Sequence, residues 1–520
     1  MVYYPLGIQT FSEIRKKGYL YVDKTQYVYE LAESKKYVFL SRPRRFGKSL
    51  LTSTFLSYFR GDKEFFKGLV IEKLEREWVH YPVLHFSLAS AKMGTVEDLT
   101  AQISLQLDWA EQEYQIMKTA GNTTARFQNV VKRLYEKTGK QVAVLIDEYD
   151  APLLTVLHDP ERLEPMRTAL QAFYSPLKDL DPYLRFVFIT GISKFSQLSI
   201  FSQINNLYNI SMLPKYSAIC GITQEELERN FQEGIHNLAE SQGWTREEVI
   251  KQLKRRYDGY HFSRQSPGVY NPFSLLYAMD AEELGNYWYA TGTPTFLIKM
   301  LRKFHTDITR IDGQRASDTE FDAPTEDMHS ILPLFYQSGY VTIKGYDPES
   351  HFYTLGYPNE EVKVGMMRAL MPSYVSSDTL AGENACWDIS KGFIDDDIDR
   401  ALSAARSFFT AIPYEEGTLK DAATSEGHFT AMLYVMFSFL NRYVYSQVRT
   451  SRGRMDILVK TRTSIYVMEL KLDGSVDDAL RQIDDKGYAI PYEADGRKVV
   501  KVGINFSSEE RTIKEWKRKS

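Results

Sequence analysis

The sequence predicts an α/β protein in three parts: a parallel sheet with helices on both faces, a mostly helical connecting region, and a smaller α/β domain at the C-terminal end. Strand-like and helix-like segments alternate over the first 215 residues, which is typical of a parallel sheet. The last third reads instead as helix, three strands, helix, strand. We therefore expect three regions, 1–215, 216–385 and 386–520.

Four short apolar runs are expected to form the N-terminal sheet. They are rich in β-branched and aromatic residues, which favour strands. The run 142–146 is continuously apolar, as a strand covered on both faces should be. Helical spacing is found at 49–59 and 97–138. The four runs are 37–40, 81–88, 142–146 and 185–190.

The remaining elements follow from the same patterns. Residues 216 to about 330 are mostly helical, 312–326 are polar enough to predict a loop, and 340–343 and 352–355 are strand-like. Arg511–Lys519 is a basic end, expected to be solvated, with a DNA-binding arm as the alternative. The C-terminal elements are expected at 425–440 (helix), 443–449, 455–460 and 464–470 (strands), 477–486 (helix) and 499–506 (strand).

The composition sets limits on location and partners. The chain has 520 residues, 43% of them apolar and 25% charged, as in ordinary soluble proteins of more than one domain. A net charge of -4 provides no global attraction for nucleic acid, so any such contact needs a local patch. Two cysteines make neither a disulfide framework nor a zinc site, and the longest apolar stretch, 429–440, is too short to span a bilayer. We expect a cytoplasmic protein without a membrane partner.

Residues 42–49 nearly match a phosphate-binding P-loop, Gly-x4-Gly-Lys-Ser/Thr, with Arg42 in place of the leading glycine. In such loops, backbone N–H groups surround phosphate oxygens at the start of a helix, where the helix dipole favours anions. The lysine neutralises the β- and γ-phosphates, and the serine ligates magnesium. The residues expected to bind nucleotide here are Arg45, Phe46, Gly47, Lys48 and Ser49.

A second acidic signal follows about 100 residues later. Asp147 and Glu148 end an apolar strand, where the first carboxylate can bind Mg²⁺ and the second can polarise the attacking water. Thr190, at the end of the fourth strand, is a candidate for sensing the γ-phosphate, although a simple strand-end turn is the alternative. The pattern predicts ATP and Mg²⁺ as cofactors. The alternative is that Asp147–Asp150 only caps a helix.

These segments together resemble the AAA-ATPase-like proteins of bacteria and archaea. The resemblance covers roughly residues 5–280 and implies a P-loop NTPase fold in which an arginine-rich loop is usual. It also implies that Asp23 and Lys24 lie ahead of the first strand, near the adenine. The matching segments are Tyr21–Thr25, Arg42–Ser49, Leu145–Asp150, Phe188–Ser193, Tyr257–Phe262 and Tyr270–Pro272.

A different constellation lies near the C-terminus. Asp456 and Glu469 fall on two adjacent strand-like segments, and a hairpin would bring their carboxylates to one end of a sheet. Two such carboxylates can hold Mg²⁺ for phosphodiester cleavage. Lys471, two residues after Glu469 and on the same face, can orient water or neutralise the transition state. Arg449, Arg452 and Arg454 form either a phosphate contact or only a basic turn.

This spacing resembles the PD-(D/E)XK nuclease superfamily, over about residues 385–507. The resemblance implies a restriction-endonuclease-like fold, with Glu426 as an additional acidic residue and Gln482 as the glutamine that some members use. Gly487-Tyr488-Ala489 also matches nuclease-like domains found behind this ATPase.

The combined motifs predict an ATP-binding and ATP-hydrolysing switch that controls a metal-dependent nuclease-like domain. The expected partner is nucleic acid, with DNA favoured over RNA, and a homo-oligomer is left open. One alternative is a signalling or scaffold ATPase whose C-terminal domain only binds nucleic acid or protein. Another is a small-molecule P-loop kinase, which accounts for the N-terminal half alone.

Overall fold

The computed structural model describes residues 2–89, 94–194, 206–290, 300–301, 310–323, 330–374, 379–410, 426–440, 444–450 and 453–519. The chain folds as two compact units. The first comprises Met1–Gly292 and Arg315–Asn359, and the second comprises Thr293–Gln314 and Glu360–Ser520. The division into three functional regions stays a prediction.

A five-stranded parallel sheet forms the centre of the first unit. Its order is β2 (Val83–Ser87), β3 (Val142–Asp147), β4 (Leu184–Gly191), β1 (Tyr37–Ser41), β5 (Tyr208–Asn209). Every residue of β1 and β3 is buried, as expected for strands covered on both sides. Because all strands are parallel, their carboxyl ends meet at one edge, where open α/β sheets bind ligands.

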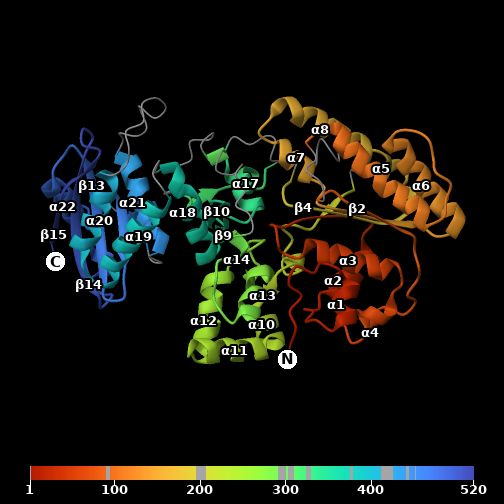
Figure 1. Ribbon diagram of the computed structural model, residues 1–520, viewed down its shortest axis with the longest axis horizontal. Helices are drawn as coiled ribbons and strands as arrows, with labels where there is room; N and C mark the ends of the chain where they lie inside the picture. The colour runs from red at the N-terminus through yellow and green to blue at the C-terminus, as the bar shows by residue number, and fades with distance from the viewer. Residues whose placement is uncertain are drawn as a thin grey trace. The chain divides into compact units, whose positions relative to one another are not determined.

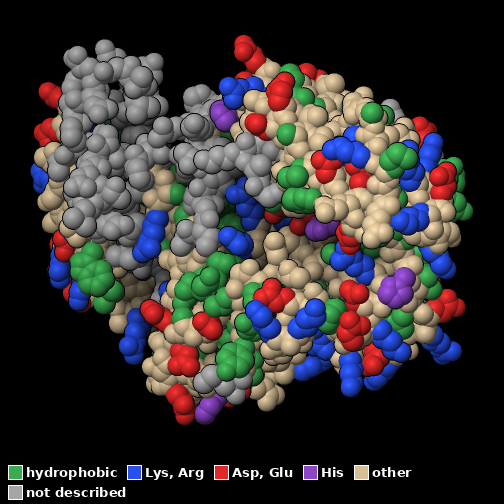
Figure 2. Space-filling view, turned by 45° about the vertical axis from the view of Figure 1, so that its right-hand side comes forward, with side chains coloured by type: hydrophobic (Ala, Val, Ile, Leu, Met, Phe, Trp, Pro, Cys, Tyr) green, Lys and Arg blue, Asp and Glu red, His purple; other side chains and the backbone are tan. Residues whose placement is uncertain are grey.

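Helices cover both faces of this sheet (Figure 1), so the predicted fold class is confirmed. One face carries α1 (Phe11–Lys17), α2 (Thr25–Ser34), α3 (Lys48–Phe59) and α4 (Ile71–Leu74). The other carries α5 (Val96–Glu113), α6 (Thr123–Thr138) and α8 (Pro160–Tyr174). Acidic and basic side chains are interspersed on the face shown in Figure 2, in keeping with the small net charge.

The single helical segment expected at 97–138 is wrong in one respect: it is two helices. α5 ends at Glu113, and α6 begins after Asn122, whose side chain accepts a hydrogen bond from the Ala125 N–H at 2.9 Å. Gly121 precedes this cap with φ at 131°, which few other residues adopt. A local cap and a glycine therefore interrupt an otherwise continuous helical pattern.

The rest of the first unit is helical with small sheets. The polar stretch 312–326, expected to be a loop, contains a strand and a short helix because Ser317 and Glu320 form a capping box. The strands expected at 340–343 and 352–355 are present and pair antiparallel. The elements are β6 (Ile222–Thr223), α10 (Gln224–Asn230), α11 (Gln232–Gln242), α12 (Arg246–Tyr257), β7 (Val269–Tyr270), α13 (Pro272–Ala281), β8 (Gln314–Ala316), α16 (Asp318–Phe321), α17 (Leu332–Gln337), β9 (Thr342–Asp347) and β10 (Phe352–Gly356).

The second unit contains a five-stranded sheet in the order β11-β12-β13-β14-β15, antiparallel except between β13 and β14. Its central run of helix, three strands, helix, strand confirms the predicted order. The elements are α18 (Glu360–Tyr374), α19 (Thr379–Ile394), α20 (Ile398–Thr410), α21 (Glu426–Leu440), β11 (Val444–Thr450), β12 (Gly453–Lys460), β13 (Ser464–Leu472), α22 (Val476–Asp485), β14 (Lys498–Ser507) and β15 (Thr512–Lys519).

The basic end of the chain is not a solvated tail but the edge strand β15. Its backbone pairs with β14, and its cations bind acidic side chains of α22: Lys517 lies 2.8 Å from Asp477, and Lys519 lies 3.0 Å from Asp484. Only its first two residues, Thr512 and Ile513, are buried, so no apolar alternation reveals this strand in the sequence. No helix in the described part of the chain is long and apolar enough to cross a bilayer.

Candidate functional sites

The phosphate loop, residues 42–49, connects β1 to α3 at the carboxyl edge of the first sheet. Gly47 has φ at 91° and precedes the first residue of α3, so the loop ends at the N-terminus of a 12-residue helix. The Lys48 ammonium is buried and donates hydrogen bonds to the carbonyl oxygens of Arg42 and Pro43, each at 3.0 Å. The structure thus places Lys48 across the loop, and Ser49 follows it in the first turn of the helix.

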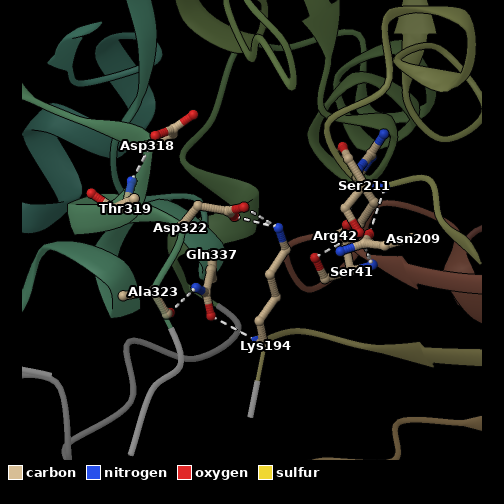
Figure 3. A network of polar contacts seen from close by, with 10 residues as sticks. All are labelled: Ser41, Arg42, Lys194, Asn209, Ser211, Asp318, Thr319, Asp322, Ala323 and Gln337. Carbon is tan, nitrogen blue, oxygen red and sulfur yellow. Dashed lines mark hydrogen bonds and ion pairs between the residues drawn. The ribbon is translucent and has the colours of Figure 1, made fainter. Parts of the chain in front are cut away.

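Arg42 does not face the phosphate position. Its guanidinium is buried and donates to the carbonyl oxygen of Ser211 at 2.7 Å (Figure 3). It also donates to the carbonyl oxygen of Tyr216 at 3.1 Å and lies 4.0 Å from the centre of the Phe262 ring. Burial lowers the pKa of Arg42 to about 10, so the group remains charged at neutral pH. The arginine in place of the leading glycine is therefore an internal anchor that ties the loop to a distant segment.

Two other residues of the loop, Arg45 and Phe46, differ in exposure. Phe46 is buried, and its ring packs 4.7 Å from Tyr260 and 5.5 Å from Phe262, so only its backbone remains available to a ligand. Arg45 is exposed, and its guanidinium lies 5.0 Å from the centre of the Phe273 ring. Arg45 has φ at 65°, which turns the chain sharply just ahead of the glycine.

The acidic residues meet the loop at the same sheet edge. The Thr190 hydroxyl, at the end of β4, donates a 2.5 Å hydrogen bond to a carboxylate oxygen of Asp147, at the end of β3. Glu148 follows with φ at 53°, a strained conformation for a glutamate. Burial raises the pKa of Glu148, and the Lys48 ammonium opposes this shift. A carboxylate with a raised pKa is suited to accept a proton from water near neutral pH.

Asp150 has a role that the sequence patterns missed, although it belongs to the acidic segment that carries the resemblance. Its fully buried carboxylate accepts hydrogen bonds from the N–H groups of Ile192 (3.0 Å) and Ser193 (2.6 Å), and from the Ser193 hydroxyl. Gly191 permits this arrangement, because a Cβ there would lie 2.5 Å from the Tyr149 ring. Asp150 thereby fixes residues 191–194, the exit of β4, against the end of β3.

The exit of β4 is also bound on its other side (Figure 3). The Lys194 ammonium forms a largely buried ion pair with Asp322, and the Lys194 N–H donates to the side-chain oxygen of Gln337 at 2.7 Å. The Gln337 amide in turn donates to the carbonyl oxygen of Ala323 at 2.9 Å. Asp322 and Gln337 both contact Lys194, which follows Thr190 by four residues, and Thr190 bonds Asp147.

A largely apolar cavity lies beside the phosphate loop, between Tyr21, Gly47 and Ile219. Lys24 lines it and forms an ion pair with Glu226 at 2.6 Å. The Asp23 carboxylate instead accepts hydrogen bonds from the N–H and hydroxyl of Thr25 and from the Val70 N–H. Lys24 is therefore placed at the cavity, whereas Asp23 stabilises the start of α2.

The second candidate site lies on the hairpin of β12 and β13 in the second unit. Ile457 is paired with Met468, and one carboxylate oxygen of Asp456 accepts a 2.9 Å hydrogen bond from the Leu470 N–H. This contact places the Asp456 side chain beside Glu469, which is 2% exposed. The hairpin therefore brings both predicted carboxylates to the same end of the sheet.

Helix α22 adds Gln482 to this pair. The Gln482 amide nitrogen donates to a carboxylate oxygen of Glu469, and its amide oxygen accepts from the Lys471 ammonium at 2.8 Å. Lys471 also lies 3.7 Å from Glu469. Gln482 of α22 thus connects the predicted acidic and basic residues, Glu469 and Lys471, which both lie on β13.

Gly503 and Asn505 of β14 bring α22 close to the sheet, and the sequence motifs did not identify either residue. Gly503 lies beside Glu469 in β14, and a Cβ there would lie 2.4 Å from the Val476 carbonyl oxygen, so only glycine permits this approach. Asn505, beside Lys471, exchanges two hydrogen bonds with the Gly474 backbone, at 3.0 and 2.9 Å. A glycine and an asparagine inside an apolar strand were the only signals in the sequence.

The structure says less about the other residues predicted at the second site, which are one glutamate and three arginines. Glu426 is the first residue of α21, but its side chain lies outside the described residues, as do the Arg449 side chain and all of Arg452. Arg454 is exposed, and its carbonyl oxygen accepts a hydrogen bond from the Tyr488 hydroxyl at 3.0 Å. Within the described residues, no three His, Cys, Asp or Glu side chains form a metal-binding group.

Two carboxylates are nonetheless a sufficient protein contribution for Mg²⁺, which usually keeps water and substrate oxygens in its shell. The residues at both sites therefore fit the metal. At the first site, Ser49 and Asp147 would hold it through their side-chain oxygens, and at the second, Asp456 and Glu469 would do so.

Comparisons with known proteins agree with both family resemblances. Residues 5–201 match the AAA-ATPase-like family, described as predicted AAA-ATPases, and residues 424–516 match the PD-(D/E)XK nuclease superfamily. A protein of Azotobacter chroococcum mcd 1, described as "uncharacterized protein in vnfD 5′ region", is 34% identical over 520 residues, covering 98% of this chain and 97% of its own. The chain thus belongs to the AAA-ATPase-like family and carries a C-terminal domain of the PD-(D/E)XK nuclease superfamily.

Proposed function

We propose that the protein is a nucleotide-dependent switch that controls a metal-dependent nuclease-like domain acting on nucleic acid, with DNA favoured as substrate. The observation that carries the proposal is the connection from the nucleotide site to the β4 exit. Thr190 bonds Asp147, and four residues later Lys194 pairs with Asp322. The segment Arg315–Asn359, which holds Asp322, leads along the chain to Glu360, where the second unit resumes.

At the first site, each residue has a distinct proposed role. The backbone of residues 45–47 binds the phosphate oxygens, and Lys48 exchanges its two carbonyl contacts for phosphate contacts when ATP enters. Ser49 and Asp147 would hold Mg²⁺, which would supply neutralisation of the developing phosphate charge. Glu148 accepts the proton of the attacking water, and its raised pKa supports this role.

The cavity beside the loop is the proposed position of the adenine. Its lining is mainly apolar, as small-molecule sites usually are, with Lys24 as a fixed polar group. Because Glu226 pairs with Lys24 from α10, occupation of the cavity would affect both the core of the first unit and its helical part.

At the second site, Asp456 and Glu469 would hold Mg²⁺, and the bound metal would supply the activation of water for phosphodiester cleavage. Lys471 stabilises the charge that develops on the phosphate, and Gln482 fixes both Lys471 and Glu469. Glu426 remains the predicted additional acid. The complete set of acidic, basic and amide groups favours cleavage over binding alone.

The test is a set of ATPase and nuclease assays with and without ATP, in Mg²⁺ or Mn²⁺, on DNA and RNA. The proposal expects metal-dependent cleavage. Asp456→Ala should abolish this cleavage, and Lys48→Ala should make its rate independent of ATP. Absence of cleavage with every substrate and metal would favour the alternative of a scaffold ATPase with a binding-only C-terminal domain. ATP turnover stimulated by a metabolite and unaffected by nucleic acid would favour a small-molecule kinase.

A further inference from the structure

A cavity of about 480 Å³ opens in the first unit at the edge opposite the phosphate loop. Tyr81 precedes β2, Arg185 lies at the start of β4, and Tyr58 is near the end of α3, and all three line the cavity. In a parallel sheet, these positions lie at the amino ends of the strands, away from the nucleotide site. The proposed function uses none of these residues.

Both aromatic and charged side chains line the cavity, and the charged ones include Arg76 as well as Arg185. Tyr58 and Trp78 are more than nine-tenths buried, and Tyr29 and Tyr81 are half-buried. Tyr81 already contacts one cation, since the Arg185 guanidinium lies 5.7 Å from the centre of its ring. Rings of this kind attract organic cations through their electron-rich faces.

One carboxylate in this lining is held ready for a cation. Glu75 accepts hydrogen bonds from the Tyr58 hydroxyl (2.6 Å) and from the Glu77 N–H (2.8 Å). Burial alone would raise the pKa of Glu75, but these hydrogen bonds hold it below its usual value, so the group is ionised. Arg185 instead pairs with Glu33, at 2.7 Å, and within the described residues no Lys or Arg forms an ion pair with Glu75.

Trp78 supplies a separate observation that points to a ligand. Its side chain is buried and lines the cavity, yet its indole N–H has no hydrogen-bond partner within the part of the chain that the structure describes. A buried donor without an acceptor destabilises the folded state. Its φ of 47° is also rare for so large a residue, and such strain persists only where the surroundings impose it. The missing group is a hydrogen-bond acceptor.

We propose that this cavity binds a basic amino acid, arginine or lysine, either free or within a peptide. The guanidinium or ammonium group lies among the aromatic rings and pairs with Glu75. The backbone carbonyl or carboxylate oxygen of the same residue accepts the Trp78 indole N–H. One ligand residue thereby satisfies both the unpaired carboxylate and the unsatisfied donor.

Calorimetric titration of the full chain tests this assignment with three probes: L-arginine, agmatine, which is arginine without its carboxyl group, and a short arginine-containing peptide. Glu75→Gln keeps an acceptor for the Tyr58 hydroxyl but removes the charge, and should weaken all three probes at least about tenfold. Trp78→Phe removes only the indole N–H, and should weaken arginine and the peptide while leaving agmatine unchanged. Glu13→Gln, an exposed carboxylate elsewhere, is the control and should have no effect.

The probes also distinguish the source of the ligand. Binding of the peptide about tenfold tighter than free arginine identifies a partner protein, and equal binding identifies a free amino acid. The assignment is overturned if no probe binds at about 10 mM, or if both cavity variants bind as the wild type does. ATP binding, measured on the same samples, reports whether the variants are folded and whether the nucleotide site is intact.

Discussion

Replacing Arg42 by glycine restores the usual phosphate-loop pattern, yet we expect it to destabilise the first unit. The guanidinium donates to the carbonyl oxygens of Ser41, Ser211 and Tyr216, and it stacks on Phe262. Hydrogen bonds from a charged donor contribute about 1.5–3 kcal/mol each, and the ring contact adds about 1 kcal/mol. Desolvation of the buried charge offsets several kcal/mol of this gain. The net loss expected for Arg42→Gly is about 3–5 kcal/mol.

Urea unfolding of the first unit, followed by tryptophan fluorescence, measures this loss. Arg44→Gly is the matched control, because Arg44 is exposed in the same loop and should cost no more than about 1 kcal/mol, the effect of glycine on the unfolded chain. ATP affinity should not rise in Arg42→Gly. The reasoning is refuted if both variants unfold at the same urea concentration, or if Arg42→Gly binds ATP more tightly than the wild type.

Three further predictions concern the two sites. Glu148→Gln should retain ATP binding but lose hydrolysis by about 100-fold or more, measured by phosphate release; equal hydrolysis would remove Glu148 as the base. Because Glu148 must be unprotonated to act and burial raises its pKa, the ATPase rate should fall on acidification with a midpoint above 4.5, the ordinary pKa of glutamate; a midpoint at or below that value would contradict this. Gly503→Ala should push α22 from the sheet and weaken Mn²⁺ binding by the full chain, measured by calorimetry; Gly345→Ala in β9, where an added Cβ would lie 3.9 Å from its nearest neighbour, is the control, and equal Mn²⁺ binding in both would contradict the role of Gly503.

Much of the fold was predictable because its signals are local. The apolar run 142–146 and the acidic pair after it identify a buried strand and its carboxyl end without any knowledge of distant residues. The helix and strand order of the C-terminal domain is readable for the same reason. In both cases, the relevant interactions repeat along a short stretch of chain.

The parts that could not be predicted depend on contacts between residues far apart in sequence. Arg42 bonds to residues 169 and 174 positions later, so nothing around it indicates that it is an anchor and not a phosphate ligand. The strand β15 is held by pairing with β14 and by ion pairs to α22, so its sequence resembles a solvated basic tail. The unsatisfied indole of Trp78 is likewise visible only in three dimensions.

The central claim is that nucleotide binding at Lys48 controls the site at Asp456 and Glu469. The most direct test is metal-dependent cleavage of DNA by the full chain, with and without ATP, in the wild type and in Lys48→Ala. The switch predicts that ATP changes the wild-type cleavage rate by about tenfold, a coupling of about 1.4 kcal/mol, and leaves the Lys48→Ala rate unchanged. The same cleavage rate with and without ATP in the wild type would contradict it.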